Sequence, residues 1–189
     1  MEIIYGIRKY VAPLTPFEQL LLKQCAENRE MDMKEYIKSC DVILPYEEMQ
    51  QNPDPAELSI YRYASQEEKK QLRRLLKESY ALEARAQKNG VEPGEYIANV
   101  IREHWRLLFP VEAVKTAIRT LRLCAAASAQ NDEEYSQKMR KYGLKVSGNL
   151  VLIPREIQPT LTCNMEGDIF TMGVFEDGES HLLELQAFQ

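Results

Sequence analysis

Residues 15–37 read TPFEQLLLKQCAENREMDMKEYI, and residues 65–97 read SQEEKKQLRRLLKESYALEARAQKNGVEPGEYI. Each stretch begins with a hydroxyl side chain that has a glutamate three residues later, which is the capping box that starts a helix. Each stretch ends on Glu-Tyr-Ile within a second amphipathic segment. The pattern predicts two helical hairpins, with helices over residues 16–28 and 33–43 in the first and over residues 66–88 and 93–108 in the second.

The two stretches are related by a constant offset at each end. Thr15 and Ser65 lie 50 residues apart, as do Glu18 and Glu68, whereas the two Glu-Tyr-Ile motifs lie 60 residues apart. One insertion of ten residues in the first helix of the second stretch accounts for both offsets. Internal duplication is the simplest explanation, and convergence of two ordinary helical hairpins is the alternative.

A short segment rich in β-branched and aromatic residues precedes each hairpin. Residues 3–11 and residues 58–64 both favour a strand. Residues 46–57 contain two prolines and no hydrophobic period, so they predict a linker. We therefore expect a first strand-helix-helix unit over residues 1–45 and a second over residues 58–110.

The chain changes character after the second unit. Residues 111–143 predict two helices, the second of them capped by Asn131 or Asp132. Residues 144–189 predict a small, acidic antiparallel β meander. The strand-like stretches in it are residues 150–153, 160–163, 169–175 and 181–185. The predicted fold class is thus α+β and mostly helical.

The composition is that of an ordinary globular protein. A hydrophobic share of 44% and a charged share of 28% allow a buried core. The apolar N-terminus is interrupted by Arg8 and Lys9, which argues against a signal peptide, and no window approaches the length of a membrane span. We expect a cytoplasmic protein that contacts no membrane.

Residues that could carry chemistry are scattered. The four cysteines have no CxxC spacing, and neither histidine is near them in sequence: Cys25, Cys40, Cys124, Cys163, His104 and His181. The sequence also contains no G-x-S-x-G elbow, phosphate-binding loop or H-E-x-x-H motif. His104 adjoins Trp105 in an amphipathic helix, where it fits a packing or surface role. We expect no metal, no cofactor and no enzymatic activity.

The charge is distributed unevenly along the chain. The net charge of -5 divides into -5 over residues 1–59, +6 over residues 60–145 and -6 over residues 146–189. A basic middle segment between acidic ends suits a polyanionic partner. A solvated helical surface with compensating ends is the alternative.

The repeated pattern resembles the ribbon-helix-helix family, including the MobC-type accessory proteins of plasmid mobilisation. The resemblance covers about residues 3–45 and 58–108 and consists of a strand, a Ser/Thr-x-x-Glu helix start, a turn and a second helix with Tyr-Ile. The matching residues are Thr15-Pro16-Phe17-Glu18 with Asp32-Met33-Lys34-Glu35-Tyr36-Ile37, and Ser65-Gln66-Glu67-Glu68 with Gly90-Val91-Glu92-Pro93-Gly94-Glu95-Tyr96-Ile97.

The resemblance implies a non-enzymatic accessory or regulatory protein, of a mobile element, that binds double-stranded DNA. In that family two strands pair as an antiparallel ribbon in the major groove, and helix N-termini approach phosphates; here both strands would come from one chain. The residues expected to reach DNA are Arg8, Lys9 and Arg62, with electrostatic attraction from Lys69, Lys70, Arg73, Arg74 and the stripe of Lys115, Arg119 and Arg122.

Two departures from the family pattern keep another interpretation open. Asp32 and Glu92 stand at helix-cap positions, where a carboxylate repels phosphate. The two strand segments also contain few polar side chains that could read bases. A protein-binding adaptor or inhibitor, which engages a nucleic-acid enzyme through its acidic surfaces, would explain both departures. Whether the chain forms a homodimer also stays open.

Overall fold

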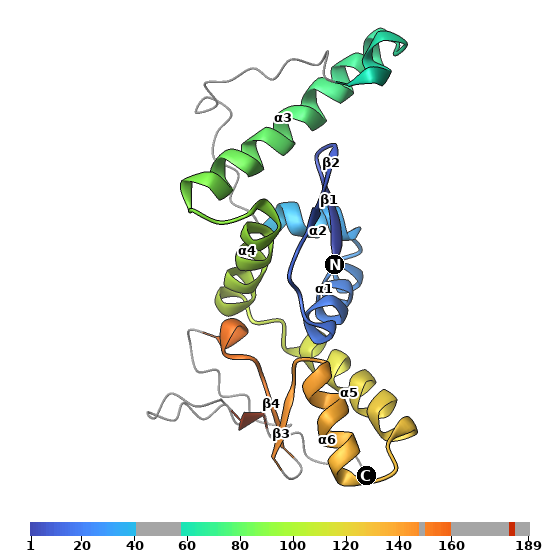
Figure 1. Cartoon of the computed structure of the whole chain (residues 1–189), viewed down its shortest axis with the longest axis vertical. Helices are drawn as coiled ribbons and strands as arrows, with labels where there is room; N and C mark the ends of the chain where they lie inside the picture. Colours follow the sequence, from blue (N-terminus) through green and yellow to red (C-terminus); the bar gives the residue numbers. More distant parts are fainter. Residues whose placement is uncertain (41–57, 148–149, 160–181, 184–189) are drawn as a thin grey trace. The chain divides into compact units, whose positions relative to one another are not determined.

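A computed structural model describes residues 1–40, 58–147, 150–159 and 182–183, and these residues form a mostly helical α+β fold (Figure 1). The predicted fold class is confirmed. The strands are β1 Glu2–Tyr5, β2 Arg8–Val11, β3 Lys145–Ser147, β4 Leu150–Leu152 and β5 Leu182–Leu183. The helices are α1 Pro16–Asn28, α2 Met33–Cys40, α3 Gln66–Lys88, α4 Pro93–Leu107, α5 Val111–Ser128 and α6 Asp132–Lys141, with short 3-10 helices η3 Ser59–Arg62 and η4 Arg155–Ile157.

The chain divides into two compact units, each built from two separate segments. Met1–Pro13 and Ile37–Val100 form the first, here called the hairpin unit. Leu14–Tyr36 and Ile101–Gln189 form the second, here called the sheet unit. The division falls inside α2 and α4, so each compact unit takes residues from both of the strand-helix-helix segments that the sequence pattern delimits.

The segment expected to be one strand over residues 3–11 is instead a complete β-hairpin. β1 pairs antiparallel with β2, and Ile3 lies opposite Tyr10. The reversal occurs at Gly6, whose φ of 63° lies in the left-handed region that glycine adopts without strain. Alternation along the two strands then buries Ile3, Tyr5 and Tyr10 on one face.

The strand expected over residues 58–64 is wrong, and so is its expected pairing with the N-terminal strand. The segment contains η3, in which Tyr61 N donates to Leu58 O at 2.9 Å and Tyr63 N donates to Ile60 O at 3.1 Å. The physical reason is that β1 and β2 take each other as hydrogen-bonding partners, whereas residues 58–64 satisfy their own donors through local turns. The β-branched and aromatic residues of this segment favour a strand, but composition alone does not determine whether another strand is available to pair with it.

The helices begin and end where the sequence signals predict, except at the end of α2, where the predicted helix continues into residues 41–43, outside the described part of the chain. The Thr15 and Ser65 side chains both cap their helices in complete capping boxes. Asn131 caps α6 by accepting from the Glu134 backbone N–H at 2.9 Å. The predicted linker at residues 46–57 also lies outside the described residues.

The turns between α1 and α2 and between α3 and α4 have the same hydrogen-bond pattern. Ala26 O accepts from Met31 N at 3.0 Å, and Ala86 O accepts from Val91 N at 3.1 Å. The residue before each donor has a positive φ, 53° in the first turn and 69° in the second. Both are helix C-caps of the same type. The offset of 60 residues thus extends from the Glu-Tyr-Ile motifs to the turns themselves, which fits duplication.

In the sheet unit, α1 packs against α5, α5 against α6, and α6 against β3. β3, which the sequence did not predict, pairs antiparallel with β4, and β4 pairs antiparallel with β5. Phe17 N, a first-turn donor of α1, is satisfied by Tyr142 O at 2.9 Å. The other predicted strands, residues 160–163 and 169–175, lie outside the described residues.

A carboxylate is buried inside the sheet unit. The Glu18 side chain is 2% exposed and closes the α1 capping box by accepting from Thr15 N at 2.8 Å. The same carboxylate accepts from Arg102 Nε at 2.7 Å and from Arg102 Nη2 at 3.1 Å. A capping residue of α1 is therefore also one half of an ion pair with α4.

Candidate nucleic-acid interface

The first half of α3 carries no buried side chain. Leu76 is the first buried residue of this helix, and the buried positions that follow it are Ser79, Leu82 and Ala86. Gly6, at the tip of the β1–β2 hairpin, lies against Leu75 and Ser79 of the helix, and η3 and the earlier turns of α3 extend past that contact (Figure 1). We call residues 59–77 the basic arm.

The basic arm holds six Lys and Arg residues against two glutamates. Five of the basic residues follow one another along α3 at helical spacing: Lys69, Lys70, Arg73, Arg74 and Lys77. At about 100° per residue, these positions fall within about 140° of the helix circumference. The buried positions of the same helix are centred on the opposite side. The sixth basic residue, Arg62, is exposed in η3.

Tyr61 of η3 contacts the first turns of α3. Lys69 Nζ lies 5.6 Å and Arg73 Cζ lies 5.5 Å from the centre of the Tyr61 ring, within the range of cation–π attraction. Ser65 N donates to the Glu68 carboxylate at 2.7 Å, and hydrogen bonding by the Ser65 side chain, followed by that of its backbone N–H, lowers the pKa of Glu68. The end of the basic arm is therefore a defined local structure and not a frayed helix terminus.

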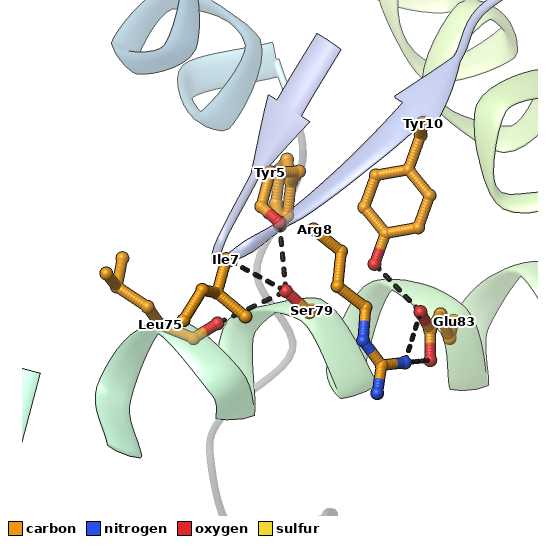
Figure 2. Close-up of polar contacts among 7 residues, drawn as sticks. All are labelled: Tyr5, Ile7, Arg8, Tyr10, Leu75, Ser79 and Glu83. Carbon is orange, nitrogen blue, oxygen red and sulfur yellow. Dashed lines mark hydrogen bonds and ion pairs between the residues drawn. The ribbon is translucent and has the colours of Figure 1, made fainter. Parts of the chain in front are cut away.

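Arg8, expected to reach DNA, is used inside the hairpin unit. Figure 2 shows its guanidinium against Glu83 of α3, with Nη1 donating to Oε1 at 2.7 Å and to Oε2 at 2.6 Å. Arg8 Cζ also lies 4.6 Å from the centre of the Tyr80 ring. Hydrogen bonding to Glu83 raises the pKa of Arg8, so this cation belongs to the packing of the hairpin on α3.

Glu83 and Ser79 are the residues of this contact that the sequence analysis missed. Tyr10 Oη donates to Glu83 Oε1 at 2.9 Å, and burial, followed by this carboxylate, raises the pKa of Tyr10. Ser79 Oγ accepts from Ile7 N at 2.9 Å and donates to Tyr5 O at 2.9 Å (Figure 2). A signal for Ser79 existed, since a small polar residue between Leu76 and Leu82 interrupts an apolar helix face.

The remaining predicted DNA contacts do not join the basic arm. Lys9 is exposed in β2, with Nζ 3.7 Å from Glu2 Oε2. The α5 stripe belongs to the sheet unit, where Lys115 pairs with Glu112 at 3.2 Å and Arg122 Nε donates to Tyr135 Oη at 3.3 Å. Arg119 is exposed on the same helix. Arg62, Lys69, Lys70, Arg73 and Arg74 thus lie together in the basic arm, whereas Arg8 and Lys9 belong to the β1–β2 hairpin and the α5 residues belong to the sheet unit.

His104 has the environment of a packing residue. Its ring meets Tyr36 edge-on, with the centroids 6.0 Å apart and the planes at 89°. Burial lowers the pKa of His104, so the ring is neutral at pH 7. Within the described ranges, no three His, Cys, Asp or Glu side chains are grouped as ligands for a metal ion, and no helix is long and apolar enough to cross a membrane.

The chain matches no protein-family model, and no curated protein or solved structure is similar to it at a significant level. Among the features described above, the basic arm is the one that gathers residues of one chemical kind on an exposed surface.

Proposed function

We propose that this chain is a cytoplasmic, non-enzymatic DNA-binding accessory protein and that it contacts DNA through the basic arm. The observation that carries the proposal is the gathering of Lys69, Lys70, Arg73 and Arg74 on one exposed face of α3, with Arg62 at its end. Lys and Arg side chains that neutralise phosphates provide most of the sequence-independent affinity for DNA.

The dimensions of the arm suit a duplex. From Lys69 to Lys77 the helix rises about 12 Å, which equals the spacing of three to four phosphates on one strand. An α-helix with its side chains is about 10–12 Å wide and fits the major groove, which is about 12 Å wide. The Arg74 side chain is 75% exposed, so it can reach a phosphate; its Nε lies 3.4 Å from Glu78, a mostly buried carboxylate that also pairs with Lys38 at 2.6 Å.

The ligand is double-stranded DNA, as the ribbon-helix-helix resemblance implies, but the element that contacts it is α3 and not a ribbon of two strands. A ribbon made of residues 3–11 and 58–64 is not formed, and Arg8 is held by Glu83. The capping carboxylates Asp32 and Glu92 no longer count against DNA, because the contact is assigned to the side of α3 and not to the N-termini of α2 and α4.

The double substitution Lys70→Ala with Arg74→Ala tests this proposal. We expect the affinity for a labelled DNA duplex to fall roughly 10-fold to 60-fold at low salt, and the slope of log K against log[salt] to decrease by about 2, since each lost phosphate contact removes about 0.9. Both positions are exposed, so the fold should be retained. Fluorescence anisotropy over a series of salt concentrations measures both quantities.

The matched control is Arg140→Ala with Lys141→Ala, which removes two exposed basic residues from α6 and changes the net charge equally. It should leave the slope unchanged. If both double variants weaken binding to the same extent, attraction depends on net charge and not on the basic arm, and the proposal is wrong. If the wild-type protein binds no DNA at low salt, the proposal is also wrong.

A protein-binding adaptor is the second candidate, and exposed apolar side chains favour it. Leu107, Leu108 and Leu123 are each more than 60% exposed in the sheet unit. Exposed apolar side chains, where they form a contiguous patch, are typical of protein contacts. Affinity purification followed by nuclease treatment distinguishes the two functions: a protein retained in stoichiometric amount after nuclease favours the adaptor, and its release favours DNA.

A further inference from the structure

Tyr63 is the most exposed large hydrophobic side chain among the described residues, with 90% of its surface in contact with solvent. It directly follows η3 and precedes Ser65, the cap of α3. The ring is therefore placed at the end of the basic arm. Ile60, 61% exposed, lies in the same short helix.

A single exposed aromatic residue is common on protein surfaces, so exposure alone proves little. The contrast with Tyr61 is more informative. Tyr61 is only partly exposed and contacts Lys69 and Arg73, so it has a structural role in fastening η3. Tyr63, two residues further on, is exposed and lies in the chain between Arg62 of η3 and the first basic residues of α3, Lys69 and Lys70.

An exposed aromatic ring beside a basic track is the chemical combination that binds single-stranded nucleic acid. The basic side chains attract the phosphates, and the ring offers a flat face for a base. A base in the interior of a duplex is stacked on both sides and offers no free face, whereas an unpaired base can stack on the ring. A phenol ring stacks on any base, which suits binding without sequence preference.

We infer that Tyr63 stacks on an unpaired base and that the ligand of the basic arm is a DNA duplex continued by a single strand. The inference rests on the proposed function and names its ligand more closely. The Lys and Arg side chains of α3 hold the phosphates of the duplex, and the single strand begins at η3, where Tyr63 receives its first base. Arg62, next to Tyr63, contributes charge at the same point.

Three labelled probes test the inference: a blunt duplex, the same duplex with a single-stranded oligothymidylate overhang, and the oligothymidylate alone. Wild-type protein should bind the overhang duplex roughly 10-fold to 100-fold more tightly than the blunt duplex, as expected for stacking of one base. Tyr63→Ala should abolish this difference without changing the affinity for the blunt duplex. Tyr63→Phe retains the ring and should keep most of the difference.

The possible results distinguish stacking by Tyr63 from DNA binding through the basic arm. If Tyr63→Ala binds the overhang duplex as tightly as wild type does, stacking is excluded, while the salt-dependent binding of the blunt duplex still supports the basic arm. If Tyr63→Leu restores the difference fully, the contact is apolar and not stacking, which also overturns the inference. If wild type binds none of the three probes, both fail. Circular dichroism verifies that each variant keeps its helix content.

Discussion

Replacement of Gly6 by alanine should lower the free energy of unfolding by about 3–5 kcal/mol. With φ at 63°, a side chain at this position is strained by about 1–2 kcal/mol. A Cβ would also lie 2.3 Å from Leu75 O and 2.4 Å from Ser79 Oγ. Relief of this clash would move the hairpin off α3 and break the Ser79 hydrogen bonds to Tyr5 and Ile7. Urea denaturation of the two proteins measures the difference.

Gly90→Ala is the matched control for this substitution. Gly90 has a similar φ of 69°, but no atom lies within 4 Å of the place where its Cβ would be. Its substitution should therefore cost only the backbone strain of about 1–2 kcal/mol. Equal losses at the two positions would mean that the hairpin is not seated on α3 through Gly6.

The helix boundaries could be predicted because the signals that set them are local. A hydroxyl or amide side chain at Thr15, Ser65 or Asn131 satisfies donors within three residues of itself, whatever the rest of the chain does. The proline at the first position of α1 acts in the same way. Neither signal depends on which other segment the helix meets.

The strands, unlike the helices, could not be predicted from local signals. A strand needs a partner strand, and the composition of a segment does not show which segment that partner is. Residues 3–11 and 58–64 are both rich in tyrosine and isoleucine, yet only the first contains a glycine where the chain can reverse and pair with itself. The second segment has no such reversal point, and local hydrogen bonds close it into η3.

In the candidate interface, too, features set by local sequence could be predicted and features set by distant contacts could not. The basic face of α3 could be predicted, since residues three and four apart on a helix share a face wherever the helix lies. The structural role of Arg8 could not be predicted, because its partner Glu83 is 75 residues away in sequence. The charge of an arginine does not indicate whether the protein itself already neutralises it.

The buried carboxylate of α1 is where we expect the second large loss of stability. Glu18→Gln keeps the size of the side chain, and glutamine also completes a capping box, so the substitution removes only the charge. Arg102 is 19% exposed, and the Glu18 carboxylate that accepts its hydrogen bonds at 2.7 and 3.1 Å would become a neutral amide. Loss of the opposite charge at this depth should lower the free energy of unfolding by about 3 kcal/mol.

The duplicated pattern supplies the control for Glu18. Glu68 occupies the same position in the Ser65 capping box but is exposed, so Glu68→Gln should change the urea midpoint little. In the double variant Glu18→Gln with Arg102→Met both charges of the pair are removed, and the loss should be smaller than for Glu18→Gln alone. If the losses of Glu18→Gln and of Arg102→Met, measured separately, simply add in the double variant, the pair is not coupled, and the stability of α1 against α4 comes from apolar packing instead.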